Sequence, residues 1–99
     1  MVNQKGDSVK QEAIKDLIVQ NELGLHARPA AMFVKVANGF KSEIFLEKDG
    51  ERVNGKSIMG VMMLAASKGT KLKLIAQGAD AGSAIGALAD LFSKKFCEA

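Results

Sequence analysis

The spacing of the apolar residues in this 99-residue chain alternates between the two-residue period of a strand and the 3.6-residue period of a helix. The alternating segments predict strands at 13–20, 42–47, 51–53 and 71–76. The remaining periodic segments predict helices at 27–37, from 57 to near 69, and 81–96. Because each helix has one apolar stripe, the helices must cover one face of one sheet. The pattern predicts an α+β fold: an open-faced β-sandwich with a four-stranded antiparallel sheet, three helices on one face and the order β-α-β-β-α-β-α.

Residues with special backbone preferences mark the ends of these segments. Pro29 falls in the first turn of the first helix, where its missing N–H costs no intrahelical hydrogen bond. That helix is expected to end in the left-handed conformation at Asn38-Gly39. A hairpin turn is predicted at Lys48-Asp49-Gly50. Asp80 is expected to cap the last helix, whose apolar stripe extends to Phe96.

The length of the chain limits it to one domain with a modest core. The first twelve residues are polar and have no apolar period, so we expect a flexible N-terminal extension at 1–12 and one domain at 13–99. No run reaches the ~18 apolar residues of a membrane span, and the first residues lack the apolar segment of a signal peptide. Cys97 is the only cysteine, which excludes an intramolecular disulfide and a multi-cysteine zinc site. We therefore expect a cytoplasmic protein.

The charge of the chain argues against nucleic acid as a partner. Fourteen basic and eleven acidic residues give a net charge of +3, and the lysines are spread along the sequence rather than clustered. The chain has no Trp and no Tyr, so it lacks the aromatic side chains on which a single-strand binder stacks bases. A small nucleic-acid-binding protein is therefore the least favoured class.

His26 is the only histidine and the only residue naturally suited to group transfer near neutral pH. It lies between a glycine-containing turn and the expected start of a helix, where free N–H groups and the helix dipole attract anions. Arg28 follows two residues later, and a guanidinium matches two phosphate oxygens at once. Because an imidazole nitrogen can attack phosphorus, these residues predict a histidine that accepts a phosphoryl group from another protein. The alternative is a histidine that only caps or packs.

Two segments resemble the signatures of the HPr family, the phosphocarrier proteins of the bacterial phosphoenolpyruvate-dependent sugar phosphotransferase system. The active-site motif of that family is similar to GLHARPAA at 24–31. The regulatory-serine segment of many of its members is similar to KSIMGVMML at 56–64. The resemblance extends from about residue 13 to residue 96, and the first dozen residues depart from the family pattern.

The resemblance implies a role for three residues. His26 matches the histidine that is phosphorylated on Nδ1, and Arg28 matches the arginine that holds the phosphate. Ser57 matches the serine that an HPr kinase/phosphorylase modifies in some lineages. The implied donor is phosphorylated enzyme I, and the implied acceptors are the IIA domains of sugar permeases; the kinase and a transcriptional regulator are further candidate partners. We expect a monomeric, stoichiometric carrier rather than an enzyme, without cofactor or metal.

The short apolar segment after Ser57 has two faces if it is helical. Val61 and Leu64 share one face, which is expected to be buried. Ile58, Met59 and Met62 are expected to form a surface for docking partners, because flexible methionine side chains adapt to several of them. Packing of these three residues in the core is the alternative.

Ser57 itself is expected to cap this helix, and a regulatory role is compatible with the cap. Two other functions stay open: a regulatory interaction module of the same fold, and a carrier of a nitrogen-related phosphotransferase branch. Loss of the histidine would favour the regulatory module, whereas His26 is present here. The segment KSIMGVM favours the sugar-type protein over the nitrogen-related one.

Overall fold

The computed structural model describes residues 11–98, so most of the extension expected at 1–12 lies outside the described residues. The strands are β1 (Glu12–Ile18), β2 (Glu43–Lys48), β3 (Glu51–Asn54) and β4 (Lys71–Gln77). The helices are α2 (Ala27–Ala37), α3 (Ile58–Met63) and α4 (Ala81–Ser93), followed by the 3-10 turn η1 (Lys95–Glu98). This is the predicted order of elements. None of the helices within 11–98 has the length and apolar character needed to cross a membrane.

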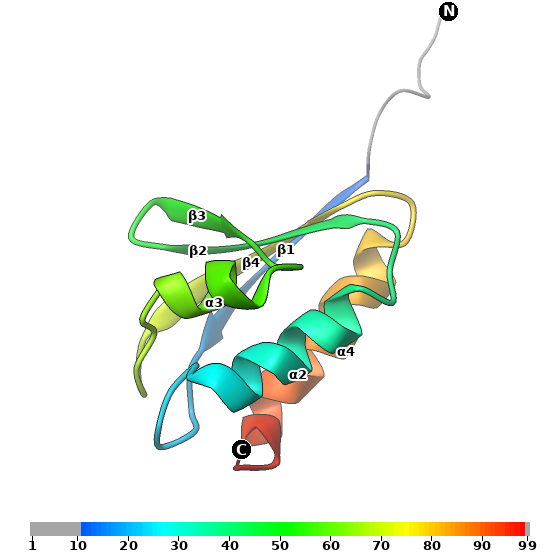
Figure 1. The fold of residues 1–99 in the computed structure, drawn as a ribbon. Helices are drawn as coiled ribbons and strands as arrows, with labels where there is room; N and C mark the ends of the chain where they lie inside the picture. Colours follow the sequence, from blue (N-terminus) through cyan, green and yellow to red (C-terminus); the bar gives the residue numbers. More distant parts are fainter. Residues whose placement is uncertain (1–10, 99) are drawn as a thin grey trace, which may run out of the picture.

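The four strands form one sheet in the order β1-β4-β2-β3, and every neighbouring pair is antiparallel. The three helices lie together on one side of this sheet (Figure 1). Their apolar stripes meet the alternating apolar residues of the strands, as the two periods require. The predicted α+β open-faced β-sandwich is confirmed.

The core fills the space between the helices and the sheet. Leu46 and Leu74 contribute from the two central strands, and both are fully buried. From the helix side, the Phe92 ring packs edge-on against Phe33 and Phe96, with centroid distances of 6.1 and 4.9 Å. Aromatic pairs in this geometry stabilise a core beyond the area that they bury.

The last helix is shorter than the sequence predicts, because α4 ends at Ser93. Lys95, Phe96 and Cys97 then adopt positive φ angles of 53°, 50° and 55°. This left-handed turn brings Phe96 into the core, where it is fully buried. The spacing of Phe96 therefore predicted its burial correctly, but the backbone that buries it is not an extension of the helix.

The end of α2 differs from the expected left-handed stop. Asn38 is the C-cap, with a right-handed φ of −69°, and its N–H donates to Val34 at 2.9 Å. Gly39 continues the turn with a hydrogen bond to Val36 at 3.0 Å and has no positive φ. The helix therefore ends by a tightened last turn.

The predicted hairpin is confirmed. β2 and β3 pair with Lys48 opposite Glu51, which leaves a two-residue turn. Asp49 and Gly50 both have positive φ, at 51° and 84°. Positive φ at both positions is typical of the type I′ turn, whose twist matches that of the strands it joins.

Candidate functional site

His26 is the N-cap residue of α2, as predicted. Its backbone is extended, with φ −79° and ψ −167°, and its carbonyl accepts the N–H of Ala30 at 3.0 Å. The imidazole is half-buried and makes no capping hydrogen bond with the helix. His26 therefore does not cap the helix with its own side chain, and it stands at the end of α2 where backbone N–H groups attract an anion.

Arg28 lies in the first turn of α2 with an exposed side chain. The first turn holds no acidic residue that would compete for an incoming anion. Pro29 follows it in the same turn and is buried, which anchors the helix start without requiring a backbone donor. The arrangement unites a nucleophilic ring, a guanidinium and the positive end of a helix dipole.

The loop before His26 is held against the loop that follows α3. Leu25 donates its N–H to the Ala66 carbonyl at 2.8 Å. Gly24 has a φ of +70°, and a Cβ at this position would lie 2.4 Å from the Ala66 oxygen. Asn21 is buried and donates from Nδ2 to the Gly24 carbonyl at 2.6 Å. These contacts place His26 relative to a segment that lies far along the chain.

An ion pair joins the same two loops at the surface. Glu22 of the loop before α2 pairs with Lys68 of the loop after α3. The hydrogen bond and the charge of Lys68 hold the pKa of the Glu22 carboxyl below its ordinary value. Both side chains are exposed, so this pair adds little to stability.

Ser57 caps α3, as predicted. Its hydroxyl oxygen accepts the N–H of Gly60 at 3.0 Å. At the other end of this six-residue helix, Lys48 donates from Nζ to the Leu64 carbonyl at 2.9 Å. A helix this short has little stability of its own, so these two bonds and the buried side chains hold it in place.

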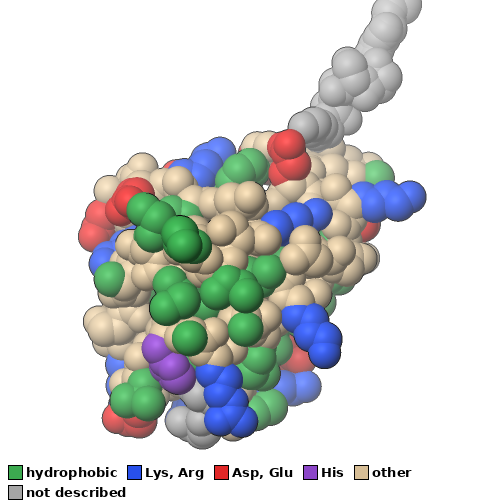
Figure 2. Space-filling model, viewed as in Figure 1, with side chains coloured by type: hydrophobic (Ala, Val, Ile, Leu, Met, Phe, Trp, Pro, Cys, Tyr) green, Lys and Arg blue, Asp and Glu red, His purple; other side chains and the backbone are tan. Residues whose placement is uncertain are grey.

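The outer side of α3 is strongly apolar, whereas Val61 and Leu64 on its inner side are buried. The exposed apolar residues, which we call the methionine face, are Ile58, Met59, Met62 and Met63. Met59 is the most exposed of them, at 73%. Figure 2 shows hydrophobic side chains gathered beside the single histidine. The three predicted docking residues are therefore exposed rather than packed in the core.

The structure brings Met62 close to His26, but it does not bring Ser57 there. A shallow hollow of about 280 Å³ is lined by both His26 and Met62, together with Leu23. Met63 and Leu23, exposed at 66% and 76%, belong to the same apolar surface and were not identified from the sequence. The exposure of Met63 could have been predicted, because a six-residue helix cannot bury all of its sides. The exposure of Leu23 could not, because a single leucine in a polar turn has no periodic pattern around it. In the described part of the chain, no cluster of three or more His, Cys, Asp or Glu side chains could hold a metal.

Comparison with known proteins gives concordant matches. Residues 13–94 match the model of the PTS-HPr family, described as the PTS HPr component phosphorylation site. The chain is 54% identical over 78 residues to the phosphocarrier protein HPr of Neisseria meningitidis, covering 79% of this chain and 88% of the relative. It also resembles the crystal structure of HPr from Thermoanaerobacter tengcongensis, with TM-score 0.84, 49% identity and coverage of 88% and 98%.

The same fold is found in Crh of Bacillus subtilis, a protein described as the catabolite repression containing protein. The match to its crystal structure has TM-score 0.69 and 49% identity, and it covers 95% of each chain. That structure is described as an intertwined dimer with a swapping domain. The similar proteins thus include some described as phosphocarriers and one whose description refers to catabolite repression.

Proposed function

This chain belongs to the HPr family of the phosphotransferase system, and from that premise we propose that it carries a phosphoryl group on His26. The donor is phosphorylated enzyme I, and the acceptors are the IIA domains of sugar permeases. The chain acts as a stoichiometric carrier rather than as an enzyme with its own turnover. The observation that carries the proposal is the position of His26 as N-cap of α2, with Arg28 in the first turn.

The chemistry is an exchange of one bond for another at phosphorus. Nδ1 of His26 attacks the phosphorus, and the bond between phosphorus and the donor breaks, so no oxidant or reductant takes part. The N–H groups at the start of α2 and the guanidinium of Arg28 stabilise the negative charge that arrives with the phosphoryl group. When an acceptor protein docks, its nucleophile attacks the phosphorus and the bond between phosphorus and Nδ1 breaks, which returns His26 to its starting state.

The methionine face is proposed as the surface on which these partners dock. Ile58, Met59 and Met62 are exposed at 44%, 73% and 42%, and Met62 lines the same hollow as His26. A partner that covers this face therefore excludes water beside the histidine, which strengthens the electrostatic interactions there. Unbranched methionine side chains can adapt to more than one partner surface.

We propose Ser57 as the regulatory site, phosphorylated by an HPr kinase/phosphorylase, with a transcriptional regulator as a further partner. Ser57 opens α3 and immediately precedes Ile58, so a phosphate there would lie at the rim of the methionine face. A module that acts only through Ser57, as in the regulatory alternative, would not need the His26 and Arg28 arrangement. The nitrogen-related branch stays an alternative that differs in its partners, not in its chemistry.

The test is phosphorylation by enzyme I and phosphoenolpyruvate. One acid-labile, alkali-stable phosphoryl group is expected on His26 of the parent protein, detected by intact mass and peptide mapping. Ser57→Ala serves as the matched control, because it keeps the histidine and should be modified at the parent rate. Modification of His26→Ala at the parent rate would exclude His26 as the acceptor. If neither the parent nor Ser57→Ala is modified, the result would favour the regulatory module.

The proposal concerns one domain that starts near residue 13 and acts in the cytoplasm. The extension at 1–12 has no role in it, so deletion of residues 1–10 should leave the rate of transfer unchanged. The proposed site is complete within one chain, because His26, Arg28 and α2 come from the same copy. Transfer is therefore expected of a monomer.

A further inference from the structure

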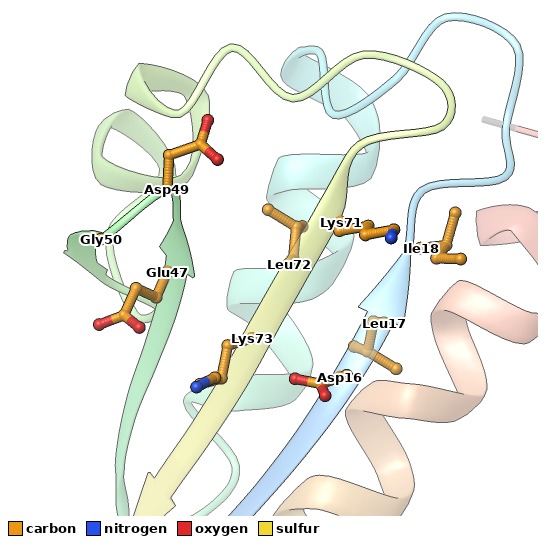
Figure 3. A pocket seen from close by; sticks show the side chains of 9 residues that line it. All are labelled: Asp16, Leu17, Ile18, Glu47, Asp49, Gly50, Lys71, Leu72 and Lys73. Carbon is orange, nitrogen blue, oxygen red and sulfur yellow. The ribbon is translucent and has the colours of Figure 1, made fainter.

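The face of the sheet opposite the helices carries an ordered pattern of side chains. Residues that pair directly across neighbouring antiparallel strands lie side by side on the same face. One row across this open face alternates in charge and consists of Asp16, Lys73, Glu47 and Arg52, in the order β1-β4-β2-β3. Figure 3 views this face, with the Lys73 side chain between those of Glu47 and Asp16 and the helices behind the sheet. We call this row the charge ladder.

The next row along the strands is apolar on β1, β4 and β2 and ends at the polar Asn54 on β3. Ile14, Ile75 and Phe45 pair across β1, β4 and β2. Ile75 is buried to 1% exposure although no helix lies on this face, while Ile14 is 52% exposed beside it. Ile18 adds a further exposed apolar residue at 49%, next to the charge ladder. The open face thus has an apolar strip that water contacts, bordered by charges of both signs.

We propose that the open face binds the open face of a second copy of this chain. The proposal rests on the order of signs in the ladder: negative, positive, negative, positive. A two-fold axis parallel to the strands, between β4 and β2, reverses this order in the second copy. Each carboxylate of the charge ladder then faces a cation. Lys73 meets Glu47 of the second copy, Asp16 meets its Arg52, and each pair occurs twice.

The same axis also matches the apolar row. It places Ile75 opposite Phe45 of the second copy, and Phe45 opposite its Ile75, while Ile14 at the edge faces Asn54. Strands of the two sheets run nearly aligned under this operation, which is the common packing of two sheets ~10 Å apart. A two-fold axis that runs along the charge ladder, perpendicular to the strands, would instead place each charged residue opposite the same residue of the second copy. The order of charges in the ladder therefore favours the axis parallel to the strands.

The side chains of the ladder are accessible to a partner. Nε of Arg52 lies 3.5 Å from Oε2 of Glu47, and its guanidinium carbon lies 5.3 Å from the centre of the Phe45 ring. The Arg52 side chain is nevertheless 46% exposed. A hollow of about 570 Å³ is lined by Asp16, Ile18 and Lys73, among others. Asp16 therefore borders open space on this face.

The size of the face sets the strength of the association. The strands β1, β4, β2 and β3 are 7, 7, 6 and 4 residues long. With ~4.8 Å between strands and ~3.3 Å per residue, they give a footprint of roughly 400 Å² on each copy, or about 800 Å² over both. That area is small for a specific interface, so the dimer is weak and forms at high protein concentration. Exposed ion pairs are screened by salt, so its dissociation constant rises with ionic strength. His26 begins α2 on the helix side of the sheet and is not covered by this dimer.

The experiment uses charge reversal and sedimentation equilibrium of the full chain at millimolar concentration and low salt. Lys73→Glu and Glu47→Lys should each be monomeric, because each sets like charges against one another across the axis. A 1:1 mixture of the two variants should dimerise, because positions 73 and 47 are both acidic in one variant and both basic in the other. Lys15→Glu is the matched control: it makes the same change in charge on β1, but Lys15 pairs with Leu74 and belongs to the other face.

The expected result is dimerisation of the parent, of Lys15→Glu and of the mixture, with at least tenfold weaker association of each single variant. Recovery in the mixture also shows that both variants are folded. A parent that stays monomeric, a mixture that stays monomeric, or single variants that dimerise as the parent does would each overturn the proposal. The last result would point to an exchange of strands, which does not depend on these charges. Phosphorylation of His26 is measured on the same samples, so failure of this proposal is distinct from failure of the phosphocarrier function.

Discussion

The carboxylate of Asp80 binds Ser42 twice, accepting hydrogen bonds from its backbone N–H at 2.9 Å and from its hydroxyl. A third hydrogen bond comes from the N–H of Lys41, also at 2.9 Å. Asp80 immediately precedes α4, yet its side chain makes no capping bond with that helix. Asp80 is thus the N-cap residue by position, as expected, but its side chain does not cap the helix. Its carboxylate instead joins the start of α4 to the loop between α2 and β2.

The Asp80 contact predicts a specific loss of stability in acid. The hydroxyl of Ser42, together with the N–H of Lys41, holds the pKa of Asp80 below its ordinary value of 3.8. The contact therefore stabilises the fold fully above pH 3.8, and this contribution is lost as the pH falls through the lower pKa of the folded protein. Urea unfolding should show Asp80→Asn less stable than the parent at pH 7, with a difference that shrinks in acid. A constant difference at every pH would contradict this, and Asp90→Asn on α4 controls for the loss of one charge.

Gly24 and Gly50 form a matched pair for testing how the loop before His26 is held. Both have positive φ, but a Cβ on Gly50 would meet nothing within 4 Å, whereas one on Gly24 would meet the backbone of Ala66. Gly50→Ala should cost ~1–2 kcal/mol of unfolding free energy from backbone strain alone. Gly24→Ala should cost more and should also slow phosphorylation of His26, because the loop must move away from Ala66. Equal losses in the two variants, with equal phosphorylation rates, would refute the close contact.

Arg28 should affect transfer without affecting the fold. Its side chain is exposed, so Arg28→Ala should change the unfolding free energy by less than ~0.5 kcal/mol. Loss of a charge-assisted contact to phosphate should slow transfer by about 10- to 100-fold. Arg28→Lys keeps the charge but loses the two-pronged geometry, so an intermediate rate is expected. Rapid-quench phosphorylation by enzyme I measures all three proteins, and identical rates would remove Arg28 from the mechanism.

A negative charge at position 57 should maintain or raise the stability of the protein but weaken its binding to enzyme I. Ser57→Ala removes the acceptor for Gly60 and should cost ~1 kcal/mol of stability while transfer stays normal. Ser57→Asp keeps an acceptor and adds a negative charge at the start of α3, so its melting temperature should equal or exceed that of the parent. The same charge must be desolvated when a partner covers the methionine face, so binding of enzyme I should weaken. An Asp variant that binds enzyme I like the parent would count against docking at this helix.

Alanine substitutions at Met59 and Val61, both in α3, distinguish an effect on docking from an effect on stability. Met59 is 73% exposed, so Met59→Ala should leave the stability within ~0.5 kcal/mol of the parent and weaken the binding of enzyme I. Val61 is fully buried, so Val61→Ala should cost about 2 kcal/mol and leave binding unchanged below its melting temperature. Calorimetric titration with enzyme I, beside thermal unfolding, checks both. Unchanged binding by the Met59 variant would exclude it from the docking surface.

Local sequence patterns are sufficient to predict the helices and strands and the residues that end them. Strand and helix periods assign each apolar residue to a side of its own segment, so the fold class and the burial of Val61 and Leu64 could be predicted. The cap at Ser57, the hairpin turn and the place of His26 at a helix start depend on residues within four positions of one another. Local preferences are sufficient for such features.

Contacts between residues that lie far apart in the chain could not be predicted from these local patterns. Asp80 acts on Ser42 across 38 residues, and Leu25 is tied to Ala66 across a similar separation. The charge ladder exists because the strand order β1-β4-β2-β3 aligns Asp16, Lys73 and Glu47, which lie on three separate segments. Periodicity states the direction in which a side chain points from its own strand or helix, but not the register or order in which segments pack. Those are set by the summed burial and hydrogen bonding of the whole fold, so they appear only when all the segments are assembled.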